Sequence, residues 1–246
     1  MIKQLAAHSI LCFSLSVASA SAFAQAITPT FATFGALPAA TFGGTGIPNN
    51  NVAITTFAGS VPLSSLTLGL SAAQRSAGGI TGAALTNDGA GSFTAESGSI
   101  FPTNPSYASW NVGFYAQGNT NLYAFKLLYD FNPASANAAA THGEMKLFTF
   151  AGNPGTGGLH QGSVNMGFGY LGASVPGFVS APAFAPFNPN SNGEYSFALV
   201  ASNKVTGLEV ARSAILVTAV PEPEGYALAV IGLAGLCFTA RRRCAR

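Results

Sequence analysis

The sequence predicts a mainly β protein, built as an antiparallel β-sandwich that is either jelly-roll-like or Ig-like. Many short apolar runs are separated by Gly-, Pro- and Asn-bearing turns, which is typical of sandwich folds. One run, over residues 122–131, alternates apolar and polar side chains. Stretches with helical spacing are few, and no internal repeat of fixed period occurs, which argues against a solenoid.

The clearest strand is expected over residues 122–131. Side chains at alternate positions of a strand point to the same face, and here the large apolar ones alternate: Tyr123, Phe125, Leu127, Tyr129 and Phe131. This pattern predicts a half-buried strand. A second strand is expected over residues 109–117. Because only the turn at residues 118–121 separates the two runs, they are predicted to form a hairpin.

Earlier elements are less regular. Residues 25–51 are rich in Ala, Thr, Gly and Pro and predict a flexible N-terminal arm with turns. Strands are expected over residues 52–57 and near 91–96. Residues 64–77 place Leu66, Leu70 and Ala73 on one side of a helix, so a short helix is predicted there. Further strands are predicted after the hairpin, over residues 144–150, 163–171, 194–202 and 210–217.

Residues 52–219 form the predicted sandwich domain, which is large enough to fold around one core. The three cysteines are Cys12, Cys237 and Cys244, all outside that domain, so it has no disulfide to stabilise it. Residues 25–220 carry five basic and six acidic side chains: Arg75, Lys126, Lys146, Lys204 and Arg212 against Asp88, Glu96, Asp130, Glu144, Glu194 and Glu209. This balance predicts no nucleic-acid partner.

Residues 1–24 have the pattern of a secretory signal peptide. Lys3 supplies a positive start, residues 10–17 supply an apolar centre, and Ala22 and Ala24 flank Phe23 in a small-x-small cleavage pattern. Cleavage after Ala24 would make Gln25 the first residue of the mature protein. The Sec translocon is therefore an expected partner, and the rest of the chain is expected to work outside the cytoplasm.

The C-terminal segment, residues 220–246, has three parts in order. Val220, Pro221, Glu222 and Pro223 come first, an uncharged apolar run over residues 226–240 follows, and three bases end it: Arg241, Arg242 and Arg243. The prolines disfavour a helix running back into the domain. The apolar run is predicted to be a short transmembrane helix, with the arginines on the cytoplasmic side.

This arrangement resembles the PEP-CTERM sorting signal, in which Val-Pro-Glu-Pro precedes a hydrophobic helix and an Arg-rich end. Residues 220–223, 228–238 and 241–243 match its three parts. The resemblance implies recognition by an exosortase, a membrane-embedded cysteine protease-transpeptidase of Gram-negative bacteria that make exopolysaccharide. It also implies removal of the tail near the Pro-Glu-Pro, so that the inner membrane holds the precursor only transiently. The alternative is a permanent anchor, although 15 residues fall short of the roughly 20 that a comfortable span needs.

Catalytic patterns are weak. Residues 167–172 match G-x-G-x-x-G, but Pro176 follows too soon for the helix that a dinucleotide site requires. His142 and His160 are the histidines of the domain, and both are interpreted as solvated loop residues. With no G-x-S-x-G sequence and no zinc-ligand spacing, we expect no enzyme, no catalytic residue and no cofactor.

Two binding features remain open. Asp130 with Asn132, or Asn87 with Asp88, could offer oxygen ligands to calcium, although turn capping explains them equally well, and no metal site is assigned. Trp110 could stack on a sugar but is interpreted as a core residue.

The expected function is that of an exported, non-enzymatic protein of the cell surface or extracellular matrix, associated with exopolysaccharide and biofilm. A carbohydrate- or surface-binding module is the alternative, with ice binding as a minor variant.

Overall fold

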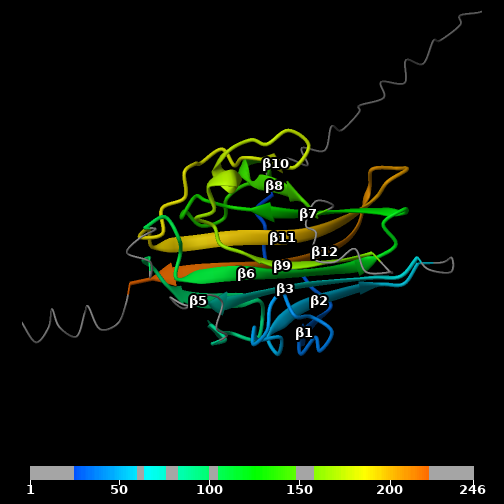
Figure 1. Ribbon diagram of the computed structural model, residues 1–246, viewed down its shortest axis with the longest axis horizontal. Coiled ribbons are helices and arrows are strands. Elements are labelled where there is room, and N and C mark those ends of the chain that lie inside the picture. The colour runs from blue at the N-terminus through cyan, green and yellow to red at the C-terminus, as the bar shows by residue number, and fades with distance from the viewer. Residues whose placement is uncertain (1–24, 60–63, 76–82, 100–104, 148–157, 222–246) are drawn as a thin grey trace, which may run out of the picture.

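The computed structural model describes residues 25–59, 64–75, 83–99, 105–147 and 158–221. These residues form two β-sheets whose strands run in roughly the same direction along the long axis of the molecule (Figure 1). One core cluster takes its buried side chains from both sheets, as expected for aligned sheets packed face to face. The mainly β sandwich predicted from the sequence is confirmed.

The first sheet has five strands in the order β1-β2-β3-β6-β9, and the second has seven in the order β10-β8-β7-β11-β12-β5-β4. The first contains β1 (Thr33–Gly35), β2 (Val52–Phe57), β3 (Leu66–Gln74), β6 (Trp110–Gly118) and β9 (Leu159–Val164). The second contains β4 (Thr86–Asn87), β5 (Ser92–Glu96), β7 (Tyr123–Tyr129), β8 (Gly143–Lys146), β10 (Val179–Ser180), β11 (Gly193–Asn203) and β12 (Glu209–Val220). The 3₁₀ turns η1 (Ala139–Thr141) and η3 (Gly169–Gly172) lie between strands. Among the described residues, the strand pairs are antiparallel except for β5 and β12, which are parallel.

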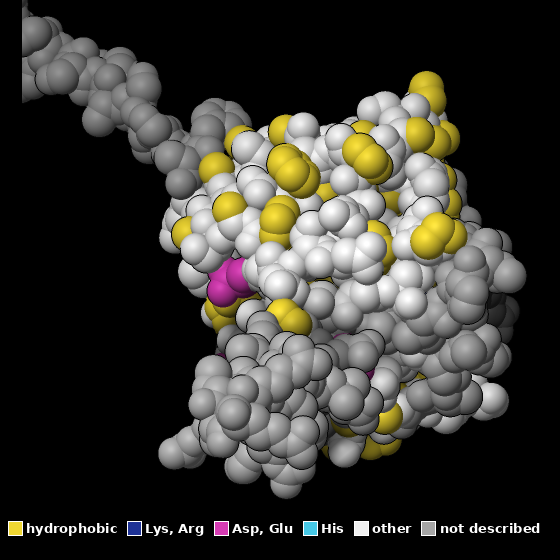
Figure 2. Space-filling view, turned by 90° about the vertical axis from the view of Figure 1, so that its left-hand side faces the viewer, with side chains coloured by type: hydrophobic (Ala, Val, Ile, Leu, Met, Phe, Trp, Pro, Cys, Tyr) yellow, Lys and Arg dark blue, Asp and Glu magenta, His cyan; other side chains and the backbone are white. Residues whose placement is uncertain are grey.

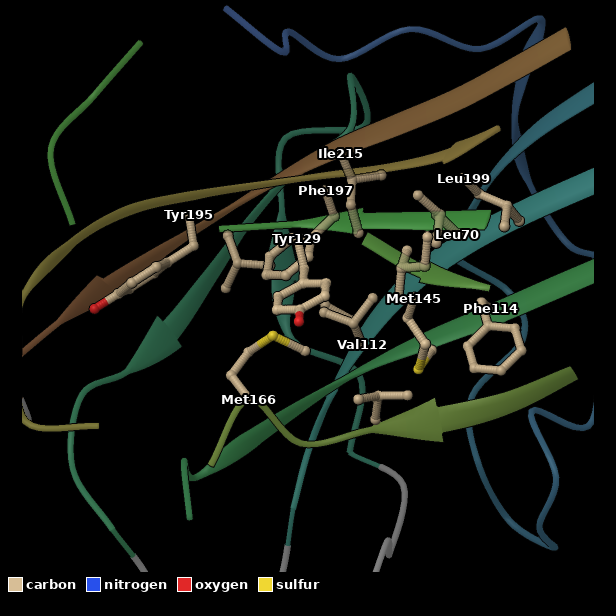
Figure 3. Packing of buried hydrophobic residues seen from close by; sticks show 14 of the residues in the cluster. Leu70, Val112, Phe114, Tyr129, Met145, Met166, Tyr195, Phe197, Leu199 and Ile215 are labelled. Carbon is tan, nitrogen blue, oxygen red and sulfur yellow. The ribbon is translucent and has the colours of Figure 1, made fainter. Parts of the chain in front are cut away.

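The core lies between the sheets. Figure 3 shows side chains from β3 and β6, among them Leu70 and Phe114, facing side chains from β11 and β12, among them Phe197 and Ile215. The alternation expected over residues 122–131 is also seen, because its five large apolar side chains are all buried: Tyr123, Phe125, Leu127, Tyr129 and Phe131.

The short helix predicted over residues 64–77 is wrong, since residues 66–74 form strand β3. Leu66, Leu68 and Leu70 recur at period two and pack into the core. The other face is covered as well, because a Cβ added at Gly69 would lie 2.8 Å from a methyl group of Leu37. A strand buried on both faces gives no simple alternation of apolar and polar residues, and this resembled a helical pattern.

The predicted hairpin between residues 109–117 and 122–131 is also wrong. β6 pairs with β3 and β9 in the five-stranded sheet, whereas β7 pairs with β8 and β11 in the other. The backbone N–H groups of Leu122 and Tyr123 both donate to the Asn119 carbonyl, so the turn itself exists. It carries the chain from one sheet to the other because the large apolar faces of both strands must meet across the core.

Residues 25–51, predicted to be a flexible arm, are packed against both sheets. Thr30 exchanges two backbone hydrogen bonds with Ala214 on β12, and β1 pairs with β2. Ile27 and Phe42 are buried. The segment therefore ties the two sheets together, and its small residues and turns permit this close packing.

Candidate functional site

Three places in the structure have the chemistry to be functional: the two ends of the described chain, a buried Asp-His-Ser cluster and a pocket lined by lysines. The sorting motif begins at one end. Val220 is the last residue of β12 and pairs with Glu96, and its carbonyl accepts a hydrogen bond of 2.8 Å from the Ser97 N–H. Pro221 follows and has no N–H with which to extend the ladder.

The other end begins at Gln25, whose carbonyl accepts a 3.1 Å hydrogen bond from the Ala139 N–H. The remaining predicted sorting and cleavage residues lie outside the described residues: Ala22, Ala24, Glu222, Pro223, Arg241, Arg242 and Arg243. The same holds for residues 226–240. Within the described part of the chain, no helix has the length and apolar character needed to cross a membrane.

The sequence analysis missed a buried polar cluster formed by Asp130, His142 and Ser196. The prediction that His142 is a solvated loop residue is wrong, because its side chain is 0% exposed. Nδ1 lies 3.0 Å from the Ala138 carbonyl oxygen, and Nε2 lies 2.7 Å from Ser196 Oγ. We assign the proton to Nδ1, which donates to the carbonyl, so Nε2 accepts from the Ser196 hydroxyl.

The cluster has the residue types of a serine hydrolase but not the arrangement. In a catalytic triad the carboxylate orients the imidazole through the nitrogen that does not face the serine. Here Asp130 Oδ2 lies 3.8 Å from Nε2, the nitrogen that already faces Ser196. All three side chains are buried, so no substrate carbonyl reaches Ser196. The hydrogen bonds of His142 connect the segment before β8 to Ser196 on β11.

Burial in this cluster lowers the pKa of His142, with the nearby Arg212 acting in the same direction and the Asp130 carboxylate and Ala138 carbonyl opposing it. The folded protein therefore keeps this imidazole neutral, while the unfolded chain protonates it near the ordinary pKa of about 6.5. Because the unfolded state binds more protons below that pH, the stabilising contribution is present above it and lost as the pH falls.

We expect the thermal midpoint, followed by circular dichroism, to fall between pH 7 and pH 5. In His142→Asn it should start lower at pH 7 but change less with pH. His160→Asn serves for comparison. Burial also lowers the pKa of His160, so this variant should also reduce the dependence of the thermal midpoint on pH, independently of His142→Asn. An unchanged slope in His142→Asn would contradict this account.

Asp130 and Asn132 cap a turn, one of the two readings that the sequence left open. Asp130 Oδ1 accepts from the Asn132 N–H at 2.9 Å, and Oδ2 accepts from Asn137 Nδ2 at 2.7 Å. In the Asn87–Asp88 turn, Asp88 Oδ1 accepts from the N–H groups of Ala90 and Ser92, and these bonds lower the pKa of Asp88. Within the described residues, no three metal-ligating side chains of His, Cys, Asp or Glu gather.

The G-x-G-x-x-G sequence at residues 167–172 is a structural turn. The strand predicted over residues 163–171 ends at Val164, because the Asn165 side chain bonds the backbone of residues 108 and 110 and turns the chain. A Cβ at Gly167 would lie 1.9 Å from the Ser106 carbonyl oxygen, which explains the glycine. No α-helix follows, since η3 is a 3₁₀ turn of four residues.

Trp110 is a core residue, as interpreted from the sequence. It is 1% exposed and contacts the rings of Phe187, Tyr195 and Phe197 at centroid distances of 5.8–6.2 Å. It is therefore unavailable for stacking on a sugar.

A pocket of about 390 Å³ lies near the start of β7, and we call it the lysine pocket. Its charged side chains are Lys126, Glu144, Lys146 and Lys204, and its remaining wall includes Tyr123, Phe125, His160 and Ser202. His160, predicted to lie in a loop, is on strand β9 and contacts the Phe125 ring at 5.9 Å. The pocket thus lies where β9 of one sheet approaches β7 of the other.

Comparison with known proteins assigns no role to these sites. No protein-family model matches the chain, and no curated protein or solved structure is significantly similar to it.

Proposed function

We propose that this chain is an exported, non-enzymatic protein of the cell surface or extracellular matrix. In this proposal a signal peptide over residues 1–24 directs export, and an exosortase recognises the motif Val220–Pro223. The apolar segment 226–240 and the arginines at 241–243 hold the precursor in the inner membrane until the tail is removed.

The position of Val220 carries the proposal. β12 lies in the interior of its sheet, between β11 and β5, and it is complete at the first residue of the motif. Cleavage C-terminal to Val220 would therefore remove no residue from the ladder. A sorting signal that begins where the last strand ends can be cut without cost to the fold.

The surface supports an extracellular role. Figure 2 shows one face on which the described side chains are mostly uncharged. The chain as a whole has only 7% charged residues. A polar but weakly charged coat suits a hydrated polysaccharide matrix and gives no electrostatic footprint for nucleic acid.

Changing Pro221, Glu222 and Pro223 together to alanine tests the proposal. In cells of the source bacterium, we expect a precursor that keeps its C-terminus, stays in the inner-membrane fraction and is lost from the cell surface. Mass spectrometry of both termini and cell fractionation measure this.

The matched control is Pro176→Ala, which changes an exposed proline in a loop and should leave sorting intact. Normal trimming and surface location of the triple variant would contradict the proposed sorting. A mature N-terminus other than Gln25 would contradict the predicted signal cleavage.

A further inference from the structure

The lysine pocket concentrates the positive charge of the domain. Three of the five bases between residues 25 and 220 line it, Lys126, Lys146 and Lys204, against one acid, Glu144. The other five acids of that region lie outside it: Asp88, Glu96, Asp130, Glu194 and Glu209. The pocket therefore carries a net charge of +2 (three lysines and one carboxylate) in a domain whose remainder is net negative.

The two bases outside the pocket are engaged elsewhere. Arg212 donates to both carboxylate oxygens of Glu209 at 2.8 Å, and the Arg75 guanidinium lies 5.0 Å from the centre of the Tyr107 ring. The lysine pocket is thus the place, among the described residues, where cations gather around a hollow.

The register of the sheet brings two of these cations together. Lys126 on β7 stands directly opposite Lys146 on β8 in the antiparallel ladder, and like charges at opposed positions destabilise a sheet. Glu144 forms a 2.7 Å ion pair with Lys126, which offsets part of the repulsion. Lys204, from the β11–β12 turn, adds a third cation to the same hollow.

The walls of the pocket select the kind of anion. Lysines attract carboxylates and phosphates alike, as point charges, so the choice between them depends on the other groups of the pocket. The Glu144 carboxylate repels any anionic group, so the charge of a ligand would lie against the lysines while its hydroxyl groups donate to Glu144. A ligand that carries both a carboxylate and donating hydroxyls matches the lysines, Glu144 and Ser202 together.

A second hollow continues from the first. A pocket of about 530 Å³ shares Thr120 with the lysine pocket and is lined by uncharged side chains that include Ser65, Thr67, Gln117 and Asn121. Such hydroxyl and amide groups bind neutral sugar hydroxyls. One acidic unit among the lysines, with neighbouring units along the second pocket, would place a chain of sugars across both.

The geometry points to a binding site for an acidic saccharide, in which Lys126, Lys146 and Lys204 hold the carboxylate of a uronic acid unit. This deepens the proposed matrix role, on which it rests, by naming the polymer class that the domain contacts. It is tested in vitro and does not depend on processing of the tail.

Titration calorimetry of the full-length chain in detergent, with tetragalacturonate as the probe, tests the site. We expect saturable binding that weakens as salt rises and that falls at least tenfold in the double variant Lys146→Met, Lys204→Met. Methionine retains most of the side-chain length and removes the charge. The matched control is Arg212→Met, which removes a cation outside the pocket and should bind as the unaltered chain does.

Four results would overturn the assignment: no binding of tetragalacturonate, equal binding of its neutral methyl ester, equal loss in Arg212→Met, or competition by inorganic phosphate at concentrations that match the probe. The last would identify the pocket as a phosphate site. A thermal midpoint for each variant within a few degrees of the unaltered chain shows that a loss of binding is not a loss of fold. If the Pro221, Glu222 and Pro223 variant is sorted normally while tetragalacturonate binds, the binding site is supported and the proposed sorting is contradicted.

Discussion

Replacing Asn165 with leucine is expected to destabilise the protein by at least about 3 kcal/mol. Asn165 is fully buried at the end of β9, and its amide group satisfies several backbone groups. Nδ2 donates to the carbonyls of Ala108 and Trp110 at 3.0 and 2.9 Å, and Oδ1 accepts from the N–H groups of Ala108 and Gly167 at 2.9 and 3.0 Å. Leucine has a similar volume but leaves all four groups without a partner.

Each buried group left without a hydrogen bond costs about 1–3 kcal/mol, and small domains are stable by only about 5–15 kcal/mol. Urea unfolding, followed by the fluorescence of the one tryptophan, measures the loss. Asn190→Leu, at an exposed position, is the control and should change the free energy of unfolding by less than about 0.5 kcal/mol. A similarly small effect at Asn165 would show that water satisfies these groups.

Strands with one buried face were predictable from the sequence. The alternation in residues 122–131 follows directly from the pleat, since Tyr123, Leu127 and Tyr129 face the core while Lys126 faces outward. The strands predicted over residues 194–202 and 210–217 are also present, as β11 (Gly193–Asn203) and β12 (Glu209–Val220), although β11 is buried on both faces over most of its length. In residues 122–131 the period of two, bounded by turn residues, is a local signal that does not depend on which strands become neighbours.

Pairing partners and buried polar groups were not predictable. β6 is buried on both faces, so its sequence shows neither that it leaves β7 nor that it pairs with β3. His142 lies between an Ala-rich segment and Gly143, a pattern that predicts a loop, yet β11 brings Ser196 against it from 54 positions away. Such contacts depend on long-range topology, and a single sequence carries no local signal for them.

The lysine pocket could not be predicted from the sequence either. Lys126, Lys146 and Lys204 are spaced across 79 positions of the chain, and nothing in their neighbours marks them as a group. Only the register that sets Lys126 opposite Lys146, with the turn after β11 folded beside them, creates the hollow. The net charge of residues 25–220 is close to zero, and a net charge does not show where in the fold the basic side chains gather.

Replacing Trp110 with alanine is expected to destabilise the sandwich by about 3–5 kcal/mol. Trp110 begins β6 in the five-stranded sheet, and its ring contacts Tyr195 and Phe197 on β11 of the other sheet. It thereby connects the two sheets next to Asn165, whose side chain donates to the Trp110 carbonyl. Alanine would remove these ring contacts and leave a cavity, because the surrounding sheets can relax only in part.

Trp110→Phe keeps an aromatic ring in the same place and should cost clearly less than alanine. Circular dichroism during urea unfolding measures both variants, since the fluorescent probe is lost with the tryptophan. Phe184→Ala, which truncates an aromatic side chain that is 51% exposed, is the control and should be nearly neutral. If Trp110→Ala unfolds outright, the phenylalanine variant still gives a measurable loss. Equal stability of Trp110→Ala and the control would mean that the two layers are not held together at this position, and the interface between the sheets would have to lie elsewhere.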